Sequence, residues 1–162
     1  MSISLELQNA LDEHSDLIVP DLDTFSQWIT CACENLALDS QNICLTIRIV
    51  TTAESQQLNR DYRHKDRPTN VLSFPYDAPE NLPEDAEIDE YLGDLAICAD
   101  IVEQEAKEQG KATIHHWSHL TVHGFLHLLG FDHIKDEDAA LMESTEINIL
   151  STLGIDDPYQ NH

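Results

Sequence analysis

Basic residues are scarce in this sequence. It has 8 Lys and Arg against 31 Asp and Glu, which gives a formal net charge of −23. A chain with this charge repels nucleic acid at long range, which argues against a nucleic-acid partner. The argument against a nucleic-acid partner is weaker for one segment, because four of the eight basic residues fall within eight consecutive positions. These four are Arg60, Arg63, Lys65 and Arg67.

Long hydrophobic runs and paired cysteines are also missing. No segment approaches the roughly 20 apolar residues that a membrane span requires, and residues 1–11 lack the basic start and apolar stretch of a signal peptide. The four cysteines show no paired metal-type spacing. We therefore expect a cytoplasmic protein without a membrane partner, whose cysteines are buried thiols in a reducing compartment. They are Cys31, Cys33, Cys44 and Cys98.

The length of 162 residues and an apolar fraction of 41% predict one compact domain over residues 1–162. Alternating apolar residues predict strands, and apolar residues at helical spacing predict helices. The strands are predicted at 3–7, 43–49, 71–74 and 92–98, and the helices at about 21–36, 52–62, 99–109, 113–129 and 136–153. This order predicts an α/β (α+β layered) fold, with a small mixed sheet of about four strands packed with about five helices. The acidic segment 77–90 has no periodicity and is predicted to be a mobile surface loop.

Three histidines carry the clearest chemical signal. His123 and His127 are four residues apart on the predicted long helix, so both imidazoles project from one face. Gly130 can end that helix in a left-handed conformation, after which the chain turns back and brings His133 toward the same point. Three neutral imidazoles suit one Zn²⁺ ion and leave its fourth position to water, as in catalytic zinc sites. Such a water titrates near neutrality and can supply hydroxide, although other first-row ions also bind imidazole.

The spacing of these ligands also raises the possibility of a peptidase. It equals the metzincin pattern H-E-x-x-H-x-x-G-x-x-H, except that Gly124 occupies the position of the catalytic Glu. Without that carboxylate, the usual general base for peptide hydrolysis is absent, which favours hydrolysis of a different substrate. His115 and His119 continue the four-residue ladder, and we expect them to be solvated or hydrogen-bonded side chains.

Three ordered blocks resemble the bacterial YbeY family. The sequence H-G-F-L-H-L-L-G-F-D-H at 123–133 is similar to the family signature H-G-x-L-H-L-x-G-Y-D-H. A second block is L-N-R-D-Y-R-H-K-D-R-P-T-N-V-L-S-F-P at 58–75, and a third is L-G-D-L-A-I-C at 92–98. The chain departs from the family at Phe131, where Tyr is usual, and in a longer and more acidic segment 77–90.

The resemblance implies a function as well as a fold. It implies a zinc-dependent, single-strand-specific endoribonuclease that acts in ribosomal RNA processing, notably 3′-end maturation of 16S rRNA, and in 70S ribosome quality control. The expected partners are single-stranded RNA, especially the small-subunit rRNA precursor, together with ribosomal proteins and ribosome-assembly factors.

The resemblance leads to a hypothesis for the role of the basic residues between 60 and 67. Arg63, with Lys65 and Arg67, forms an electropositive lip that holds an RNA phosphate beside the metal, and Arg63 stabilises charge in the transition state. Arg63 is the first choice because the family's basic position falls there. The alternative is that all three are ordinary solvated charges. Ser73, on the predicted strand 71–74, lies either near the substrate or on the strand surface.

Two acidic residues are candidates for orienting a ligand histidine or a water molecule. They are Asp94, which follows Gly93, and Asp132, for which a turn-capping role is an equal alternative. Nothing in the sequence identifies a general base.

The sequence is also compatible with two other functions. The first is a metal-dependent peptidase, which Gly124 argues against. The second is a ribosome-assembly binding factor in which zinc mainly holds the fold, which a site with three ligands rather than four argues against.

Overall fold

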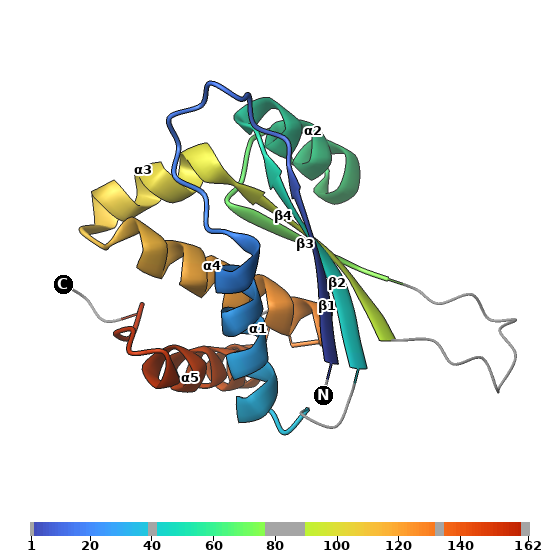
Figure 1. Cartoon of the computed structure of the whole chain (residues 1–162), viewed down its shortest axis with the longest axis vertical. Helices are drawn as coiled ribbons and strands as arrows, with labels where there is room; N and C mark the ends of the chain where they lie inside the picture. The colour runs from blue at the N-terminus through green and yellow to red at the C-terminus, as the bar shows by residue number, and fades with distance from the viewer. Residues whose placement is uncertain (1, 39–41, 77–89, 132–134, 160–162) are drawn as a thin grey trace, which may run out of the picture.

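The computed structural model describes residues 2–38, 42–76, 90–131 and 135–159, and these residues form four strands and five helices (Figure 1). The elements are β1 (Ser2–Asn9), α1 (Leu22–Asn35), β2 (Asn42–Val50), α2 (Thr52–Arg63), β3 (Val71–Pro75), β4 (Glu90–Cys98), α3 (Ala99–Gln109), α4 (Thr113–Leu128) and α5 (Asp136–Thr152). Each predicted strand and helix is present, with ends that differ by at most two residues. The predicted mixed sheet with its helices is therefore confirmed. The predicted loop 77–90 lies outside the described residues except for its last position.

The sheet has the strand order β1-β2-β4-β3, with β1, β2 and β4 parallel and β3 antiparallel to β4. β3 is thus an edge strand, and Ser73 pairs with Leu95 while Phe74 pairs with Asp94. Successive side chains along a strand point to opposite faces. Leu95 accordingly packs into the main core with the helices, whereas its neighbour Ala96 packs on the opposite face.

The main core lies between one face of the sheet and helices α1, α4 and α5 (Figure 1). Its largest fully buried side chains include Trp117, Phe25, Phe125, Ile29, Ile47, Leu95 and Leu126. A smaller cluster of Val50, Leu72, Ala96 and Cys98 covers the other face, where Leu58 of α2 packs against it. Because α4 has buried residues on most of its surface, little of it is left to face solvent.

Side-chain caps begin helices α1 and α2. The Asp21 side chain accepts the backbone N–H of Thr24 at 2.9 Å, and the Thr51 hydroxyl accepts that of Glu54 at 3.2 Å. The Glu54 carboxylate does not bond back to Thr51 as in a capping box, and it accepts a hydrogen bond from Arg48 Nε at 2.6 Å instead.

The cysteines are free thiols, as expected. Three are buried and Cys44 is partly exposed, and burial raises the pKa of Cys33 to about 11. None of the helices in the described part of the chain combines the length and the apolar character that crossing a membrane requires.

Gly124 allows α4 to approach the sheet closely. A Cβ atom at this buried position would lie 2.9 Å from Leu95 Cδ2 and 3.2 Å from Val71 Cγ2. The close approach also lets the Ser73 hydroxyl donate to the Gly124 carbonyl at 3.1 Å. A glutamate in the metzincin position would therefore have to displace the helix or its neighbours, so the glycine serves packing here.

We predict that Gly124→Val lowers the free energy of unfolding by about 1–3 kcal/mol, because the added methyl groups overpack the contact with Leu95 and Val71. Urea denaturation followed by tryptophan fluorescence measures this change. The matched control is His115→Val on the exposed side of α4, which is expected to change stability by no more than about 0.5 kcal/mol. Equal stabilities for the two variants would show that the close approach is not a packing constraint.

Candidate metal centre

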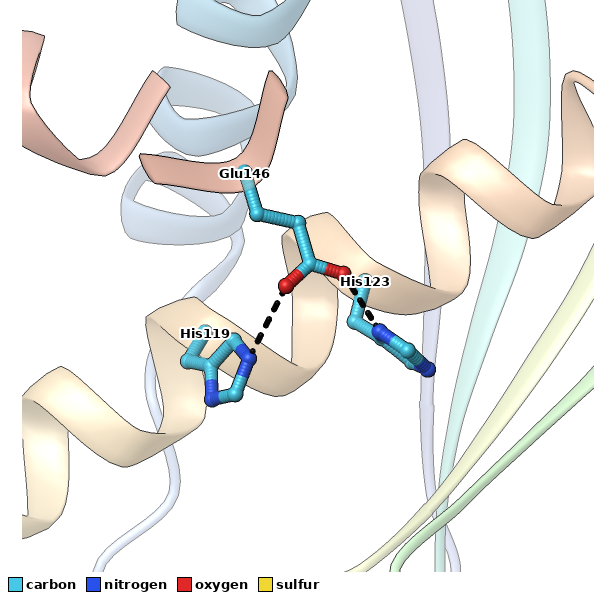
Figure 2. Close-up of side chains that lie close together, drawn as sticks. All are labelled: His119, His123 and Glu146. Atoms are coloured by element: carbon cyan, nitrogen blue, oxygen red, sulfur yellow. Dashed lines mark hydrogen bonds and ion pairs between the residues drawn. The ribbon is translucent and has the colours of Figure 1, made fainter. Parts of the chain in front are cut away.

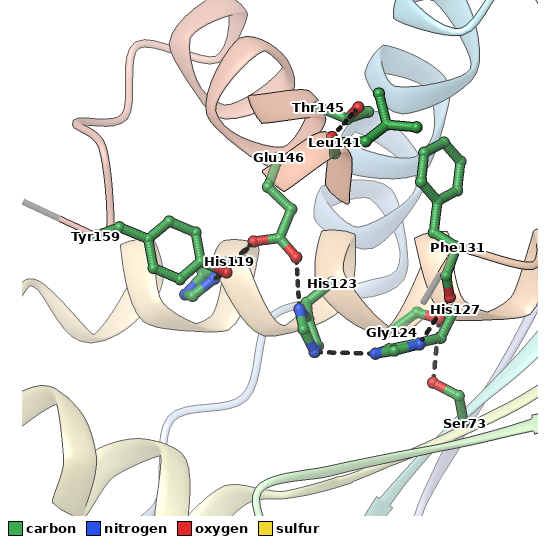
Figure 3. Close-up of polar contacts among 10 residues, drawn as sticks. All are labelled: Ser73, His119, His123, Gly124, His127, Phe131, Leu141, Thr145, Glu146 and Tyr159. Atoms are coloured by element: carbon green, nitrogen blue, oxygen red, sulfur yellow. Dashed lines mark hydrogen bonds and ion pairs between the residues drawn. The ribbon is translucent and has the colours of Figure 1, made fainter. Parts of the chain in front are cut away.

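His123 and His127 lie one turn apart on α4 and turn their rings toward one another (Figure 3). The ring centroids are 4.7 Å apart at an interplanar angle of 81°, and the two Nε2 atoms are 3.2 Å apart. The spacing of four residues predicted that both imidazoles share one helix face. The structure brings these two predicted ligands together.

The Nδ1 atoms of both rings face oxygen acceptors. His123 Nδ1 lies 2.5 Å from Oε1 of Glu146, and His127 Nδ1 lies 3.0 Å from the carbonyl oxygen of Phe131. Because a carboxylate and a carbonyl accept hydrogen bonds, the ring protons belong on Nδ1 and the lone pairs on Nε2. Two acceptor nitrogens 3.2 Å apart repel each other unless a cation or a proton lies between them.

The end of α4 explains how Phe131 reaches His127. Gly130 adopts a φ of 98°, and its N–H donates to the carbonyl of His127 at 3.0 Å. The N–H of Phe131 donates to the carbonyl of Leu126, also at 3.0 Å, which completes a Schellman motif. This turn places the Phe131 carbonyl against His127. The predicted third ligand, His133, and the candidate Asp132 lie outside the described residues.

Two different donor sets can be considered for a metal ion. His119, His123 and Glu146 offer ligand atoms that all lie within 4.8 Å of one another (Figure 2). However, His123 Nδ1 and Glu146 Oε1 are only 2.5 Å apart, so they contact each other directly and are too close to be two ligands of one tetrahedral zinc ion. Two nitrogens bound to one tetrahedral zinc at about 2.0–2.1 Å would lie roughly 3.3–3.4 Å apart, which is close to the Nε2 separation of His123 and His127.

Glu146 therefore fits the role of an orienting acceptor better than that of a ligand. Its side chain on α5 is fully buried. Ligand histidines usually donate their second N–H to a carboxylate or a carbonyl, and His123 and His127 each do so. The donor chemistry of the site thus suits a cation held by the Nε2 atoms.

Glu146 also accepts hydrogen bonds from His119 Nε2 at 3.2 Å and from the Tyr159 hydroxyl. Burial by itself raises the pKa of Glu146, but the hydrogen bonds from His119 and His123 outweigh it and lower the pKa to about 2. Burial lowers the pKa of His119, which favours the neutral ring, and burial raises the pKa of Tyr159. The expectation that His119 is a hydrogen-bonded side chain is confirmed.

A groove of about 700 Å³ opens beside the histidine pair. It is lined by Tyr62, Arg63, Thr69, Asn70, Val71, Leu72, Ser73, Phe74, Pro75, His123 and His127. No acidic residue is among these lining residues, although the chain as a whole carries a net charge of −23. An anionic ligand in this groove therefore meets no carboxylate among the lining residues.

The predicted basic lip is only partly assembled at this groove. Arg63, the last residue of α2, lines the groove together with His123 and His127. Lys65 and Arg67 are exposed in the following loop and are not among the lining residues. Ser73 lines the groove, but its hydroxyl is engaged by the Gly124 carbonyl.

Asp94, a candidate for orienting a ligand histidine or a water molecule, does not orient His123 or His127. Asp94 precedes the core residue Leu95 on β4, so its side chain points to the opposite face of the sheet from α4. There it accepts a hydrogen bond from the Tyr91 hydroxyl.

Glu146, which takes the orienting role, was missed from the sequence. A signal existed, because Glu146 falls at the i+4 position of the buried stripe formed by Met142, Ile149 and Leu150 on α5. A charged residue within an apolar stripe needs a buried partner. The sequence alone does not indicate that the partner is His123.

Comparisons with known proteins show the family of the chain. A family model described as Endoribonuclease YbeY matches residues 10–154. The chain belongs to the YbeY family. It is 50% identical over 142 residues to an Endoribonuclease YbeY of Colwellia psychrerythraea, an alignment that covers 87% of this chain and 88% of that protein. It is 48% identical over 141 residues to the Endoribonuclease YbeY of Idiomarina loihiensis, covering 87% and 83%.

A solved structure shares the fold of this chain. The solution structure of a Thermotoga maritima protein matches with a TM-score of 0.54 at 22% identity, covering 98% of this chain and 99% of that one. At this identity the likeness concerns the fold.

We predict that Glu146→Ala lowers the free energy of unfolding of the metal-free protein by about 2–4 kcal/mol. The substitution leaves donors on His119, His123 and Tyr159 without their acceptor, and each unsatisfied buried group costs about 1–3 kcal/mol, less where water can reach it. Urea denaturation in the presence of a chelator measures the loss. The control is Glu143→Ala, an exposed acid on the same helix, with an expected change within about 0.5 kcal/mol. A loss no larger than that of the control would remove Glu146 from the network.

Proposed function

We propose that this YbeY-family chain is a zinc-dependent endoribonuclease that cleaves single-stranded RNA. The observation that carries the proposal is the pair of Nε2 atoms of His123 and His127, 3.2 Å apart, beside a groove lined by Arg63 and by no acid among the described residues. Membership of a family whose relatives are named Endoribonuclease YbeY supports the RNA substrate.

The proposed ligands of one Zn²⁺ ion are His123, His127 and His133. The Nδ1 hydrogen bonds to Glu146 and Phe131 support the first two, because they leave Nε2 as the donor atom of each ring. A zinc ion held there would supply Lewis acidity toward a phosphoryl oxygen. Glu146 is unsuited to act as a general base, since both of its oxygens already accept hydrogen bonds.

The groove offers Arg63 as the group that binds the RNA phosphate. A guanidinium can donate two parallel hydrogen bonds to phosphate oxygens and can stabilise charge that develops during cleavage. Among the described residues Arg63 forms no ion pair that would compete with the phosphate, unlike its neighbour Arg60, which contacts Asp61 and Asp66. Lys65 and Arg67 lie outside the groove lining, so their proposed role is attraction of RNA over a longer range.

Aromatic side chains in the groove support a preference for single strands. The ring of Tyr62 lies edge-on to that of Phe74, with centroids 4.8 Å apart, and Tyr62 remains 66% exposed. Both residues line the groove next to Arg63. An unpaired base can stack on an exposed aromatic ring, whereas the bases of a duplex already stack on each other.

The finer assignment follows from the family resemblance. We propose a cytoplasmic role in ribosomal RNA processing, with 3′-end maturation of 16S rRNA and 70S ribosome quality control as its tasks. The net charge of −23 supports docking beside basic ribosomal proteins and assembly factors, because charge complementarity steers the encounter.

Two alternative functions, a peptidase and an assembly factor without catalysis, have less support than the endoribonuclease. A peptidase lacks its catalytic carboxylate, since Gly124 sits where a Cβ atom would already crowd Leu95. An assembly factor without catalysis would function without the metal. In a ribosomal RNA profile, His127→Ala is expected to reproduce loss of the protein, and normal RNA ends in that variant would favour the assembly factor.

We predict that His127→Ala abolishes tight zinc binding, whereas His119→Ala weakens it by no more than about 100-fold, the usual range for a residue outside the ligand set. Competition with a chromophoric chelator measures both affinities. If the ion is instead held by His119, His123 and Glu146, His119→Ala abolishes tight zinc binding and His127→Ala only weakens it.

We predict that Arg63→Ala lowers kcat for cleavage of a single-stranded RNA by about 100-fold, the typical effect of removing one donor to a charged transition state. Zinc content is measured in the same samples and is expected to be unchanged. Lys65→Ala serves as the control and is expected to affect KM more than kcat. Unchanged turnover by Arg63→Ala at full zinc occupancy would exclude Arg63 from the mechanism.

A further inference from the structure

The C-terminal segment folds back onto α4 after α5 ends. Gly154 adopts a φ of 78°, and the N–H of Ile155 donates to the carbonyl of Leu150 at 2.9 Å, so α5 ends in the same type of turn as α4. The ammonium group of Lys111, just before α4, donates to the carbonyl of Pro158 at 3.4 Å. This path carries Tyr159 to the side of His119 (Figure 3).

Tyr159 makes its contacts with the network behind the histidine pair. Its hydroxyl donates to Glu146 Oε2 and lies 3.3 Å from His119 Nε2. The Tyr159 ring is edge-on to the His119 ring, with centroids 5.4 Å apart and an interplanar angle of 84°. Tyr159 thus helps to cover a carboxylate that is fully buried.

The hydrogen bonds around Glu146 form a consistent set. His119 Nδ1 has no hydrogen-bond partner among the described residues, so the ring proton belongs on Nε2, which faces the carboxylate. Oε2 then accepts from His119 and Tyr159, and Oε1 accepts from His123 Nδ1. The two donors on Oε2 fix the rotation of the carboxylate, and that rotation aims Oε1 at His123.

We propose that Tyr159 is a positioning residue of the metal centre, which acts through Glu146 to hold the His123 ring with its proton on Nδ1 and its donor lone pair on Nε2. The inference rests on the proposed function, because it takes Nε2 of His123 as a metal ligand. It makes the C-terminal segment part of the site, 36 residues beyond the ligand that it orients.

The test uses the full-length Tyr159→Phe variant, which keeps the ring against His119 and removes only the hydroxyl. Zinc affinity is measured by chelator competition and is expected to fall by about 10-fold, the lower end of the effect of outer partners of a metal site. The imidazole nitrogen resonances of His123 in the metal-free protein report which of the two ring nitrogens carries the proton. The fraction of the Nδ1–H tautomer is expected to fall as well.

Tyr91→Phe is the matched control. Tyr91 also donates its hydroxyl to a carboxylate, that of Asp94, but on the face of the sheet away from α4. Its substitution is expected to change neither zinc affinity nor the His123 tautomer. An equal loss of zinc affinity in both variants would overturn the proposal, because the loss would then follow from removing any tyrosine hydroxyl that donates to a carboxylate and not from the contact with Glu146.

A double-mutant cycle separates action through Glu146 from an independent effect. In the Glu146→Ala background, Tyr159→Phe is expected to change zinc affinity by less than about twofold, because the residue through which it acts is gone. Full additivity of the two losses, or wild-type affinity and tautomer in Tyr159→Phe alone, would overturn the proposal. Failure of the proposed function would look different, because His127→Ala would then bind zinc as tightly as the wild type.

Discussion

Two hydrogen bonds, one donated by Nδ1–H of His123 and one by Nδ1–H of His127, orient the two rings of this site. Glu146 and the Phe131 carbonyl accept these bonds, and each thereby directs the lone pair of its ring to Nε2. In the proposed zinc site, the resulting pair of donor atoms would be preorganised for one cation, so little rotational freedom would be lost on binding. Glu146 stays ionised because its hydrogen bonds lower its pKa to about 2 despite its burial.

The rest of the fold supports this arrangement from both sides of α4. Gly124 lets the helix lie close to β3 and β4, which brings the groove-lining strand next to the histidine pair. On the far side, α5 presents Glu146 from within its apolar stripe. The Schellman turn at Gly130 then closes the hydrogen bond to His127. One helix therefore joins the core to the groove, and the groove carries Arg63 in a chain that is otherwise strongly acidic.

Local features of this protein could be predicted from sequence, and long-range pairings could not. Patterns within a few residues predict the strands and the helices. They also predict the N-cap at Asp21 and the glycines that end α3 and α4. The pairing of His123 with Glu146 spans 23 residues and depends on how α5 packs. Asp94 was a candidate for orienting a ligand histidine, but strand alternation with the core residue Leu95 places Asp94 on the face of the sheet away from α4.

A crystal structure of the zinc-loaded protein, with the ion located by its anomalous scattering, tests the central claim most directly. One zinc ion is expected at about 2.0–2.1 Å from Nε2 of His123 and of His127, with Nδ1 of His123 still donating to Glu146. An ion bound by His119, Nδ1 of His123 and a carboxylate oxygen of Glu146 would contradict it.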